Sequence, residues 1–407
     1  MQHQTSFSHR ARLLLLLLAA TTSAQAQFDV QDSHTTASFR GIHSLGNGVA
    51  WASGTDGTVL RTLDGGTLWQ PCSTPPGAEK LDFRGIQAFD QNTAVVMSSG
   101  KGDLSRLYKT TDGCRTWRLL FTNPDKPEGF FDALLMLNPQ NGVVLGDSAP
   151  AELRNPLVST GLFRVRVTNN GGQTWMPITD EQTCQDSNGG VTSVRTTPGN
   201  GLSALHNESF FAASNSSIVS SEGRLYLATS QGRLLSTAIT PSSFLIAACG
   251  GQMDPYSGAC IHPWPDWHKA QVPIRSSTDS AGIFSIAASR VGHLVAVGGD
   301  YKRSDVASET AAFSTDGGQH WTAAINTPHG YRSSVAYDPR SRTWITVGPN
   351  GTDISRDDGR NWTPLKSAAN HPPDTDNDWN ALSLPFVVGP HGRIGKLRAD
   401  ALVPAQP

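Results

Sequence analysis

The chain has 407 residues, of which 16% are charged, and its formal net charge is −2. This balance excludes a bulk electrostatic attraction to nucleic acid or to an anionic membrane. The length suits one large all-β domain or two smaller ones. The 40 glycines and the low share of charged residues favour many short strands joined by tight turns.

The N-terminal 26 residues predict a cleavable secretory signal. Arg10 and Arg12 supply positive charge, an apolar core follows at 13–20, and Ala24-Gln25-Ala26 matches a small-residue cleavage site. The apolar core is too short to span a bilayer, and no later segment is long enough. No cysteine follows the cleavage site directly, so a lipid anchor is not expected there. We therefore expect a soluble protein that is secreted or periplasmic.

Downstream of the signal, a pattern of four short strands recurs. Each unit opens with an aromatic residue, and a second apolar run, a third strand and a fourth strand follow. The seven openings are at Phe39, Phe83, Phe131, Phe211, Phe284, Tyr331 and Trp379. Seven such units predict an all-β fold, a seven-bladed β-propeller over residues 27–400 with a tail at 401–407.

Five units carry a turn of the pattern Ser/Thr-x-Asp-x-Gly-x-x-Trp. Asp and Gly suit a tight turn, because the carboxylate accepts backbone N–H groups and glycine adopts positive φ. The tryptophan then packs between sheets and donates its N–H to a carbonyl. The pattern resembles the Asp-box, or BNR repeat, of β-propellers, and we assign it a structural role. Its key residues are Asp64 and Trp69, Asp112 and Trp117, Asn170 and Trp175, Asp316 and Trp321, and Asp357 and Trp362.

Two of these turns depart from the pattern. Cys114 stands where glycine is expected in the second turn, and Asn170 stands where aspartate is expected in the third. Since both changes touch the residues that shape the turn, we expect them to loosen it locally without abolishing it.

The fourth unit has no such turn. Its third strand, 232–236, and its tryptophan strand, 267–272, are separated by an insertion at about 237–266. Cys249 and Cys260 lie close together in this insertion and are the preferred disulfide in an exported protein. The remaining cysteines, Cys72, Cys114 and Cys184, are odd in number, and the sequence does not pair them.

The insertion also holds residue types that bind zinc. Cys249, Cys260, His262, Asp266 and His268 include a Cys-x-His-x5-His spacing. An oxidising compartment favours a disulfide between the two cysteines instead, so we predict a disulfide-bonded surface loop and no metal.

The seventh unit lacks a fourth strand. It ends at 392–397 with a segment that resembles a third strand. We expect residues 28–36 to supply the missing outer strand, which would pair the two ends of the chain and close the ring.

In a propeller, the innermost strand of each blade begins at one mouth of the central channel. The residues that follow the opening aromatics are therefore expected at that mouth: Arg40, Arg84, Asp132, Ala212, Ser285, Arg332 and Asn380. Asp147 and Asp300 follow second strands, and His206 and Glu208 precede the fourth opening, at the same end. Arginine binds carboxylate or phosphate in a bidentate fork, which indicates a ligand-binding funnel. The alternative is that the arginines pair with the aspartates and merely fill the channel.

Several segments resemble those of a known family. They are the Phe-Arg-Gly openings and the segments 51–55, 107–112, 121–124, 210–214, 280–284 and 297–301. Together they resemble exported bacterial propellers related to the photosystem II stability and assembly factors, over most of residues 36–398. Relatives of this kind often carry loose names such as oxidoreductase or glycosyl hydrolase.

The resemblance implies a seven-bladed propeller that binds a membrane-protein precursor through an arginine-lined face. Carried onto this sequence, that face would contain Arg40, Arg84 and Arg332. Asp132 and Asn380, which are expected at the same mouth from their place in the repeat, complete the predicted partner-binding residues. The implied partner is a protein or peptide client, with no cofactor and no nucleic acid, and the implied state is a monomer. The insertion in the fourth unit departs from the family pattern.

Two functions from different classes stay open. The first is a non-enzymatic binding or assembly scaffold. The second is a glycoside hydrolase of sialidase type, which needs two suitably spaced carboxyl groups or a Tyr–Glu nucleophile. Its candidate residues are Asp132, Asp147, Asp300 and Glu208, with Tyr301 or Tyr331 as the phenol. No Arg-Ile-Pro opening is present to support it.

An oxidoreductase has little support from sequence motifs. The chain has no Gly-x-Gly-x-x-Gly after a strand, no Cys-x-x-Cys and no haem-attachment motif.

Overall fold

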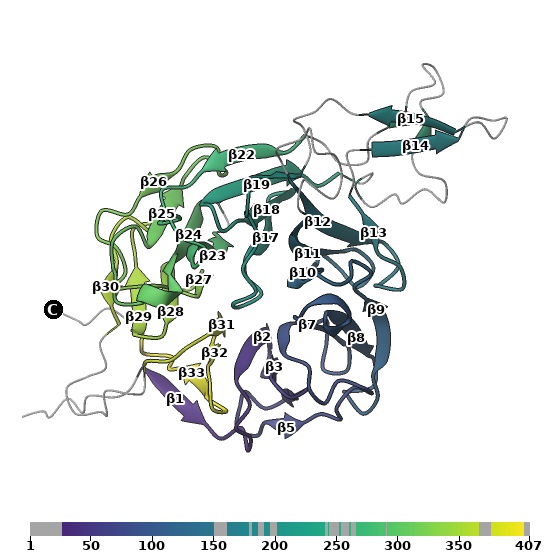
Figure 1. Cartoon of the computed structure of the whole chain (residues 1–407). Coiled ribbons are helices and arrows are strands. Elements are labelled where there is room, and N and C mark those ends of the chain that lie inside the picture. The colour runs from purple at the N-terminus through teal and green to yellow at the C-terminus, as the bar shows by residue number, and fades with distance from the viewer. Residues whose placement is uncertain are drawn as a thin grey trace, which may run out of the picture.

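The chain folds into a ring of seven antiparallel sheets around a central channel (Figure 1). The computed structural model describes residues 27–149, 161–178, 202–240, 266–289, 291–365 and 376–402, together with Ser243 and the strands of two hairpins. The predicted signal segment lies outside the described residues. Within them there is no α-helix, and no helix is long and apolar enough to cross a membrane. The predicted seven-bladed propeller is confirmed.

The first three blades follow one another along the chain. Blade 1 contains β2 (Phe39–Gly46), β3 (Val49–Gly54), β4 (Val59–Thr62) and β5 (Gln70–Pro71). Blade 2 contains β6 (Phe83–Ala88), β7 (Ala94–Ser98), β8 (Arg106–Thr110) and β9 (Arg118–Thr122). Blade 3 contains β10 (Phe131–Met136), β11 (Gly142–Ala149), β12 (Gly161–Thr168), β13 (Met176–Pro177) and β16 (Ser203–Ala204), which also pairs with β12.

Blades 4 to 6 continue in the same direction around the ring. Blade 4 contains β17 (Ile218–Ser221), β18 (Arg224–Ala228), β19 (Arg233–Ala238) and β22 (His268–Gln271). Blade 5 contains β23 (Ala281–Ala288), β24 (Leu294–Asp300), β25 (Ala311–Ser314) and β26 (Thr322–Ala323). Blade 6 contains β27 (Ser334–Asp338), β28 (Thr343–Gly348), β29 (Gly351–Ser355) and β30 (Thr363–Pro364).

The two ends of the described chain meet in blade 7. This blade contains β31 (Ala381–Ser383), β32 (Phe386–Val388) and β33 (Ile394–Leu397), and β1 (Phe28–Gln31) is its outer strand. β1 pairs antiparallel with β33, from Phe28 opposite Leu397 to Gln31 opposite Ile394. The predicted closure is therefore confirmed, and it covers an edge of β33 that would otherwise be open for pairing.

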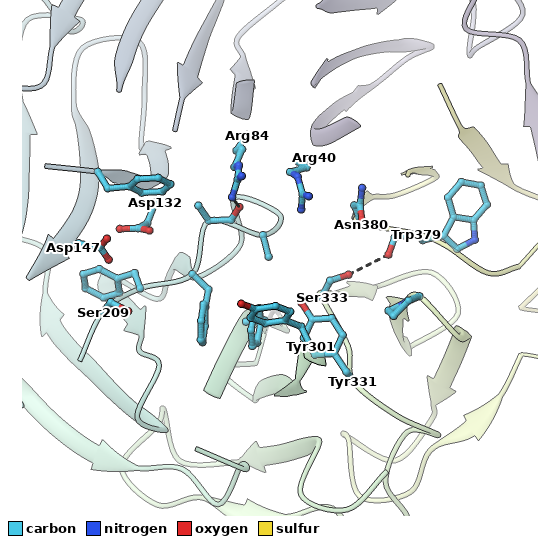
Figure 2. A pocket seen from close by; sticks show the side chains of 17 residues that line it. Arg40, Arg84, Asp132, Asp147, Ser209, Tyr301, Tyr331, Ser333, Trp379 and Asn380 are labelled. Atoms are coloured by element: carbon cyan, nitrogen blue, oxygen red, sulfur yellow. Dashed lines mark hydrogen bonds between the residues drawn. The ribbon is translucent and has the colours of Figure 1, made fainter. Parts of the chain in front are cut away.

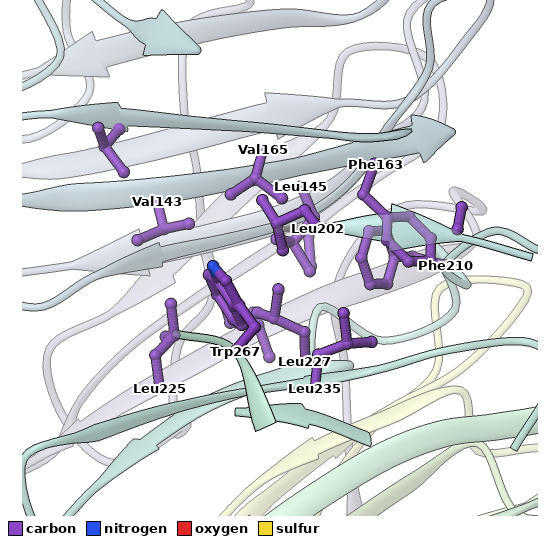
Figure 3. Packing of buried hydrophobic residues seen from close by; sticks show 14 residues of the cluster. Val143, Leu145, Phe163, Val165, Leu202, Phe210, Leu225, Leu227, Leu235 and Trp267 are labelled. Carbon is purple, nitrogen blue, oxygen red and sulfur yellow. The ribbon is translucent and has the colours of Figure 1, made fainter. Parts of the chain in front are cut away.

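One apolar cluster lies between each pair of neighbouring blades. Figure 3 shows the cluster between blades 3 and 4, where Val143 and Val165 face Leu225 and Leu227. Trp267 fills the middle of this cluster and is 6% exposed. Truncation of such a tryptophan to alanine costs about 3–5 kcal/mol, so these clusters hold each blade against the next.

The five repeat turns share one hydrogen-bond pattern. In the first, Thr62 Oγ1 donates to Asp64 Oδ1 at 2.8 Å and accepts from the Gly66 N–H at 2.9 Å. The same aspartate oxygen accepts from the Leu68 N–H at 3.0 Å. Four of the tryptophans donate to a backbone carbonyl, whereas Trp69 donates to the side-chain oxygen of Gln31 on the closing strand.

The two departures from the pattern do not loosen their turns, contrary to expectation. Cys114 adopts φ 59° and still donates its N–H to Thr110 at 3.0 Å. Asn170 Oδ1 accepts from the Thr174 N–H at 3.0 Å, as an aspartate oxygen would. The turn depends on one acceptor oxygen and on a residue in the left-handed region, and cysteine and asparagine supply these here.

Cys114 also forms a disulfide with Cys72. Their Cα atoms are 5.2 Å apart and 42 residues separate them in the sequence, so the bond joins the end of blade 1 to the repeat turn of blade 2. The sequence did not identify this pair, because no local spacing relates the two residues. The predicted Cys249–Cys260 pair and the side chain of Cys184 lie outside the described residues.

The fourth unit is built as predicted, apart from its beginning. β19 pairs with β22 from Arg233 opposite Gln271 to Ser236 opposite His268, on either side of the insertion. A short hairpin of β20 (Gln252–Met253) and β21 (Cys260–Ile261) lies within the insertion. A second hairpin, β14 (Glu181–Gln185) with β15 (Val191–Arg195), forms a separate two-stranded sheet between β13 and β16 in the sequence and was not anticipated.

The predicted opening of unit 4 at Phe211 is wrong, because β17 begins only at Ile218. Residues 209–217, here called the channel segment, instead run through the channel as irregular backbone (Figure 1). Asn215 exchanges hydrogen bonds with the N–H and C=O of Leu134 in blade 3, at 2.7 and 3.1 Å. Ser214 donates to the carbonyl of Ser333 in blade 6 at 2.7 Å. Short polar side chains thus replace strand pairing and fix this segment inside the ring.

Candidate functional site

A cavity of about 480 Å³ lies at one mouth of the channel, beside the channel segment (Figure 2). Six of the seven blades contribute to it. Its polar lining includes Arg40, Arg84, Asp132, Asp147, Ser209, Tyr301, Ser333 and Asn380. Its apolar lining includes Phe130, Phe210, Phe211, Phe284, Tyr331 and Trp379. The size is within the usual range for a small-ligand site.

Two arginines lie side by side on one wall. Arg84 is held in place, because its Nε donates to Asp82 at 2.7 Å and its Nη1 donates to the carbonyl of Ala212 at 3.3 Å. Arg40 has no ion pair among the described residues, and its buried Nε has no hydrogen-bond partner. Burial, reinforced by the positive charge of Arg84, lowers the pKa of Arg40. An anion placed here would relieve an unpaired buried cation.

Two carboxyl groups lie at the other end of the cavity. Asp132 on β10 is 2% exposed, and Asp147 on β11 is its neighbour (Figure 2). Burial and the adjacent Asp147 raise the pKa of Asp132 well above its usual range. Burial also raises the pKa of Asp147 to about 6, against the opposing effects of Arg164 and of the Phe210 N–H. The raised pKa values favour the protonated form of Asp132 at neutral pH.

Aromatic rings form the wall between these two ends. Phe211 of the channel segment stacks on Phe284 with centroids 3.8 Å apart. Tyr331 meets Phe284 edge to face at 4.7 Å, and burial raises the pKa of Tyr331, so this phenol stays neutral. Tyr301 lies at the rim and is 49% exposed. The wall can pack against the apolar parts of a ligand.

The predicted convergence of three arginines is wrong for Arg332. Its side chain is fully buried and does not line the cavity. It forms an ion pair with Asp353 on β29, and its Nη1 donates to the carbonyl of Tyr331 at 2.8 Å. His329 and Asn350 complete this cluster. Because the buried carboxylate of Asp353 lies within reach, Arg332 pairs with it and does not line the channel mouth.

Two predicted carboxylates also lie elsewhere. Asp300 does not line the cavity and accepts hydrogen bonds from Ser280 at 2.7 Å and from the Lys302 N–H at 3.0 Å. Glu208 is fully buried in an ion pair with Arg233 and accepts from Thr229 at 2.6 Å. Both carboxylates are engaged in holding loops, so of the four candidate carboxylates only Asp132 and Asp147 line the cavity.

The other predicted mouth residues have mixed positions. Asn380 lines the cavity and donates to the carbonyl of Phe39 at 2.8 Å. Ala212 lines it through the channel segment. Ser285 lies deeper in the channel, where its Oγ accepts from Ser216 at 2.7 Å. His206 is on an exposed loop, and its carbonyl accepts from Gln231.

No group of three metal-binding side chains occurs within the described part of the chain. Of the candidate zinc set, Cys249, His262 and the side chain of Cys260 lie outside the described residues. Asp266 and His268 are described, and both are exposed.

The sequence did not anticipate the channel segment or the partner of Arg332. The sequence does contain a signal for the partner of Arg332. Asp353 stands two residues before the hydroxyl of its repeat turn, where the other turns have Leu60, Tyr108, Arg166 and Ala312. A lone aspartate at a position that is buried in its blade requires a cationic partner close by. The signal for the channel segment is the run of small polar residues after Phe211.

Comparison with known proteins finds solved structures that share this fold. No family model matches the chain, and neither does any curated protein. The structure of YCF48 bound to D1 peptide is similar, with 16% identity, a TM-score of 0.53, and coverage of 92% of this chain and 98% of that chain. YCF48 from Cyanidioschyzon merolae is similar at 17% identity with a TM-score of 0.54, covering 92% of this chain and 100% of that chain. The expected resemblance to photosystem II assembly factors is thus confirmed at the level of fold: this chain is a seven-bladed β-propeller like YCF48.

Proposed function

We propose that this protein is a non-enzymatic propeller that captures a peptide segment of a client protein in the cavity at the channel mouth. Arg40 and Arg84 bind a carboxylate of the client, and the aromatic wall packs against its apolar side chains. The observation that carries this proposal is Arg40, a largely buried cation without an ion-pair partner among the described residues, on the wall of a cavity. A carboxylate matches an arginine fork in shape and charge.

The comparisons support a peptide client. One of the similar propellers is YCF48 bound to D1 peptide, and its fold spans nearly the whole of this chain. By extension we propose that the client here is a protein precursor, such as that of a membrane protein. The channel segment lines the cavity and binds blades 3 and 6 across the channel, so we propose that a client inserts a chain end or a loop and does not thread through the ring.

A capture experiment tests this function. The full chain is immobilised and exposed to an extract of the exported proteins of its source, and the Arg40→Ala, Arg84→Ala double variant is treated in parallel. We expect a client on the wild-type protein that is lost from the double variant. Arg118→Ala is the matched control, because Arg118 is exposed on the outer strand β9.

Two results decide the matter. Capture that is equal for wild type and the double variant, with both folded, contradicts the role of the arginines. A client that is lost equally from Arg118→Ala reveals a general charge effect rather than a site, and also contradicts the proposal.

A glycoside hydrolase is the second candidate, and one observation favours it. Asp132 and Asp147 both line the cavity, and the pKa of each is raised, as a general acid requires. Turnover of chromogenic glycosides that disappears in Asp147→Asn would establish it. No turnover across a broad panel, from folded protein, removes it.

We also propose that the protein is exported and acts as a monomer. The Cys72–Cys114 disulfide supports export, because such bonds persist in oxidising compartments. N-terminal sequencing of the protein from its source tests cleavage after Ala26, and sedimentation tests the monomer. An uncleaved N-terminus or a stable dimer contradicts these two points.

A further inference from the structure

The carboxyl pair of the cavity lacks a counter-charge. Asp132 is almost completely buried, and its Oδ2 has no hydrogen-bond partner. Both Asp132 and Asp147 line the cavity, close to each other (Figure 2). Neither carboxylate forms an ion pair within the described part of the chain.

The cations that face this pair are engaged elsewhere. Arg84 on β6 faces Asp132, but its Nε is bound to Asp82. Arg164 on β12 faces Asp147, but it is paired with Asp125 at 3.6 Å. The other charged group that acts on Asp132 is Asp147, whose like charge raises the pKa of Asp132 further.

Such an arrangement is electrostatically incomplete. Burial of two adjacent carboxylates is costly, and a bound proton, a nearby cation or hydrogen-bond donors are needed to offset that cost. Burial raises the pKa values of both groups, so a bound proton offsets the cost where no cation is present. A ligand cation would take over this role and release the proton.

We infer that Asp132 and Asp147 bind a cationic side chain of the client, a lysine or an arginine, while Arg40 and Arg84 bind a carboxylate of the same segment. The cavity thus selects a peptide that carries both charges. This inference rests on the proposed peptide-binding function. Phe130 and Phe210 line the cavity near the carboxyl pair, where they offer apolar faces to the methylene stem of a lysine.

A set of matched peptides tests this selectivity. The probes are acetylated hexapeptides with a free C-terminal carboxylate, in which one lysine moves through the last four positions of an Ala-Phe background. Each has a counterpart with norleucine, which keeps the stem and removes the charge. Binding to the full chain is measured by calorimetry at pH 7.5, with Arg118→Ala as the control protein.

At one or more positions we expect lysine to strengthen binding about tenfold over norleucine, as a buried charge-assisted hydrogen bond would. Asp147→Asn should abolish this preference. Because Asp147 is less buried than Asp132, this variant is the safer one for folding, and Asp132→Asn repeats the test independently. Arg118→Ala should keep the preference.

Proton release supplies a second readout. Calorimetry at pH 6 in buffers of different ionisation enthalpy should show that lysine peptides release up to about one proton more than norleucine peptides. Asp147→Asn should reduce that difference.

Equal affinity and equal proton release for lysine and norleucine peptides would overturn the inference and leave the proposed function standing. Binding of none of the peptides by the folded protein would contradict both.

Discussion

Arginine follows the opening aromatic residue in blades 1, 2 and 6, but the three side chains have different surroundings. Arg332 in blade 6 is fully buried and paired with Asp353, whereas Arg40 and Arg84 reach the cavity. The difference comes from the third strand of each blade. Blade 6 has Asp353 two residues before its repeat turn, where blades 1 and 2 have Leu60 and Tyr108. In a repeat protein, equivalent positions thus share a place in the fold, and the neighbouring strand decides their role.

The carboxyl groups show the same contrast. Asp353 is surrounded by donors from Arg332 and His329, and although its burial acts in the opposite direction, these donors lower its pKa. Asp132 Oδ2 has no hydrogen-bond partner, and the burial of Asp147 is opposed only weakly by Arg164 and the Phe210 N–H, so burial dominates and the pKa values of both groups rise. One region is electrostatically complete and serves stability, while the other is incomplete and open to a ligand.

The largest expected effect on stability is in the electrostatically complete region around Arg332 and Asp353. Arg332→Ala leaves Asp353 buried without its main partner, so we expect the free energy of unfolding to fall by about 3–5 kcal/mol. Chemical denaturation measures it. Arg118→Ala on the outer strand should stay within about 0.5 kcal/mol of wild type. A loss for Arg332→Ala no larger than that of the control would show that the ion pair is not structural.

The Cys72–Cys114 disulfide allows blades 1 and 2 to be compared with blade 6. It ties blade 1 to blade 2, the two blades that carry Arg40 and Arg84. Cys72→Ala should lower the free energy of unfolding by about 2–4 kcal/mol. Hydrogen exchange should rise at the junction of blades 1 and 2 and stay unchanged around Arg332 in blade 6. Exchange that rises equally in all blades would mean that the ring opens as one unit and that the disulfide has no local role.

Cys114→Gly is a matched variant for this prediction. It removes the same bond but places glycine at a position with φ 59°, where a side chain is unfavourable. It should therefore be less destabilising than Cys114→Ala by about 1 kcal/mol.

The third effect concerns the incomplete region and depends on pH. The pKa of Asp147 is raised to about 6 in the folded chain, so its ionisation opposes folding above pH 6, and this cost disappears as the pH falls towards its ordinary pKa. Asp147→Asn should therefore raise the free energy of unfolding at pH 7.5 by about 1–3 kcal/mol and have little effect near pH 4. Urea denaturation at several pH values measures this dependence.

Asp316 in a repeat turn is the contrasting carboxylate. Burial acts to raise its pKa, but hydrogen bonds from His320 and Ser314 outweigh it and lower the pKa to about 2. Asp316→Asn should therefore destabilise the protein at neutral pH, and the loss should vanish only as the pH falls to about 2. The same sign for Asp147→Asn and Asp316→Asn would contradict the contrast between the two regions.

Most of the fold followed from the sequence because its repeat has physical causes that act locally. The turn residues and the buried tryptophans follow from short-range patterns, and the closing strand at Phe28 follows from the strand that the last repeat lacks. The site was less accessible, since it depends on which side chains meet across the ring. Four residues predicted for the site do line the cavity: Arg40, Arg84, Asp132 and Asn380. The partner of Arg332 and the Cys72–Cys114 bond were not predicted, because both depend on contacts between residues far apart in the sequence.

The channel segment marks the limit of pattern-based prediction. Phe211 stood at the expected spacing for an opening aromatic, but the strand of blade 4 begins at Ile218. Ser214 and Asn215 bind blades 6 and 3, which no local spacing reveals. As a result, two residues expected at a strand start, Phe211 and Ala212, instead form one side of the cavity.

The smallest expected effect on stability is at Arg40, and it separates binding from folding. Arg40→Met keeps an apolar stem and removes a buried N–H that has no partner, so the free energy of unfolding should change by no more than about 1 kcal/mol. Client capture should nevertheless fall, because the cavity loses its unpaired cation. Parallel denaturation and capture measurements make the comparison with Arg332→Ala direct. If Arg40→Met unfolds the protein as Arg332→Ala is expected to, then Arg40 is also a structural arginine, and the distinction between a complete and an incomplete region fails.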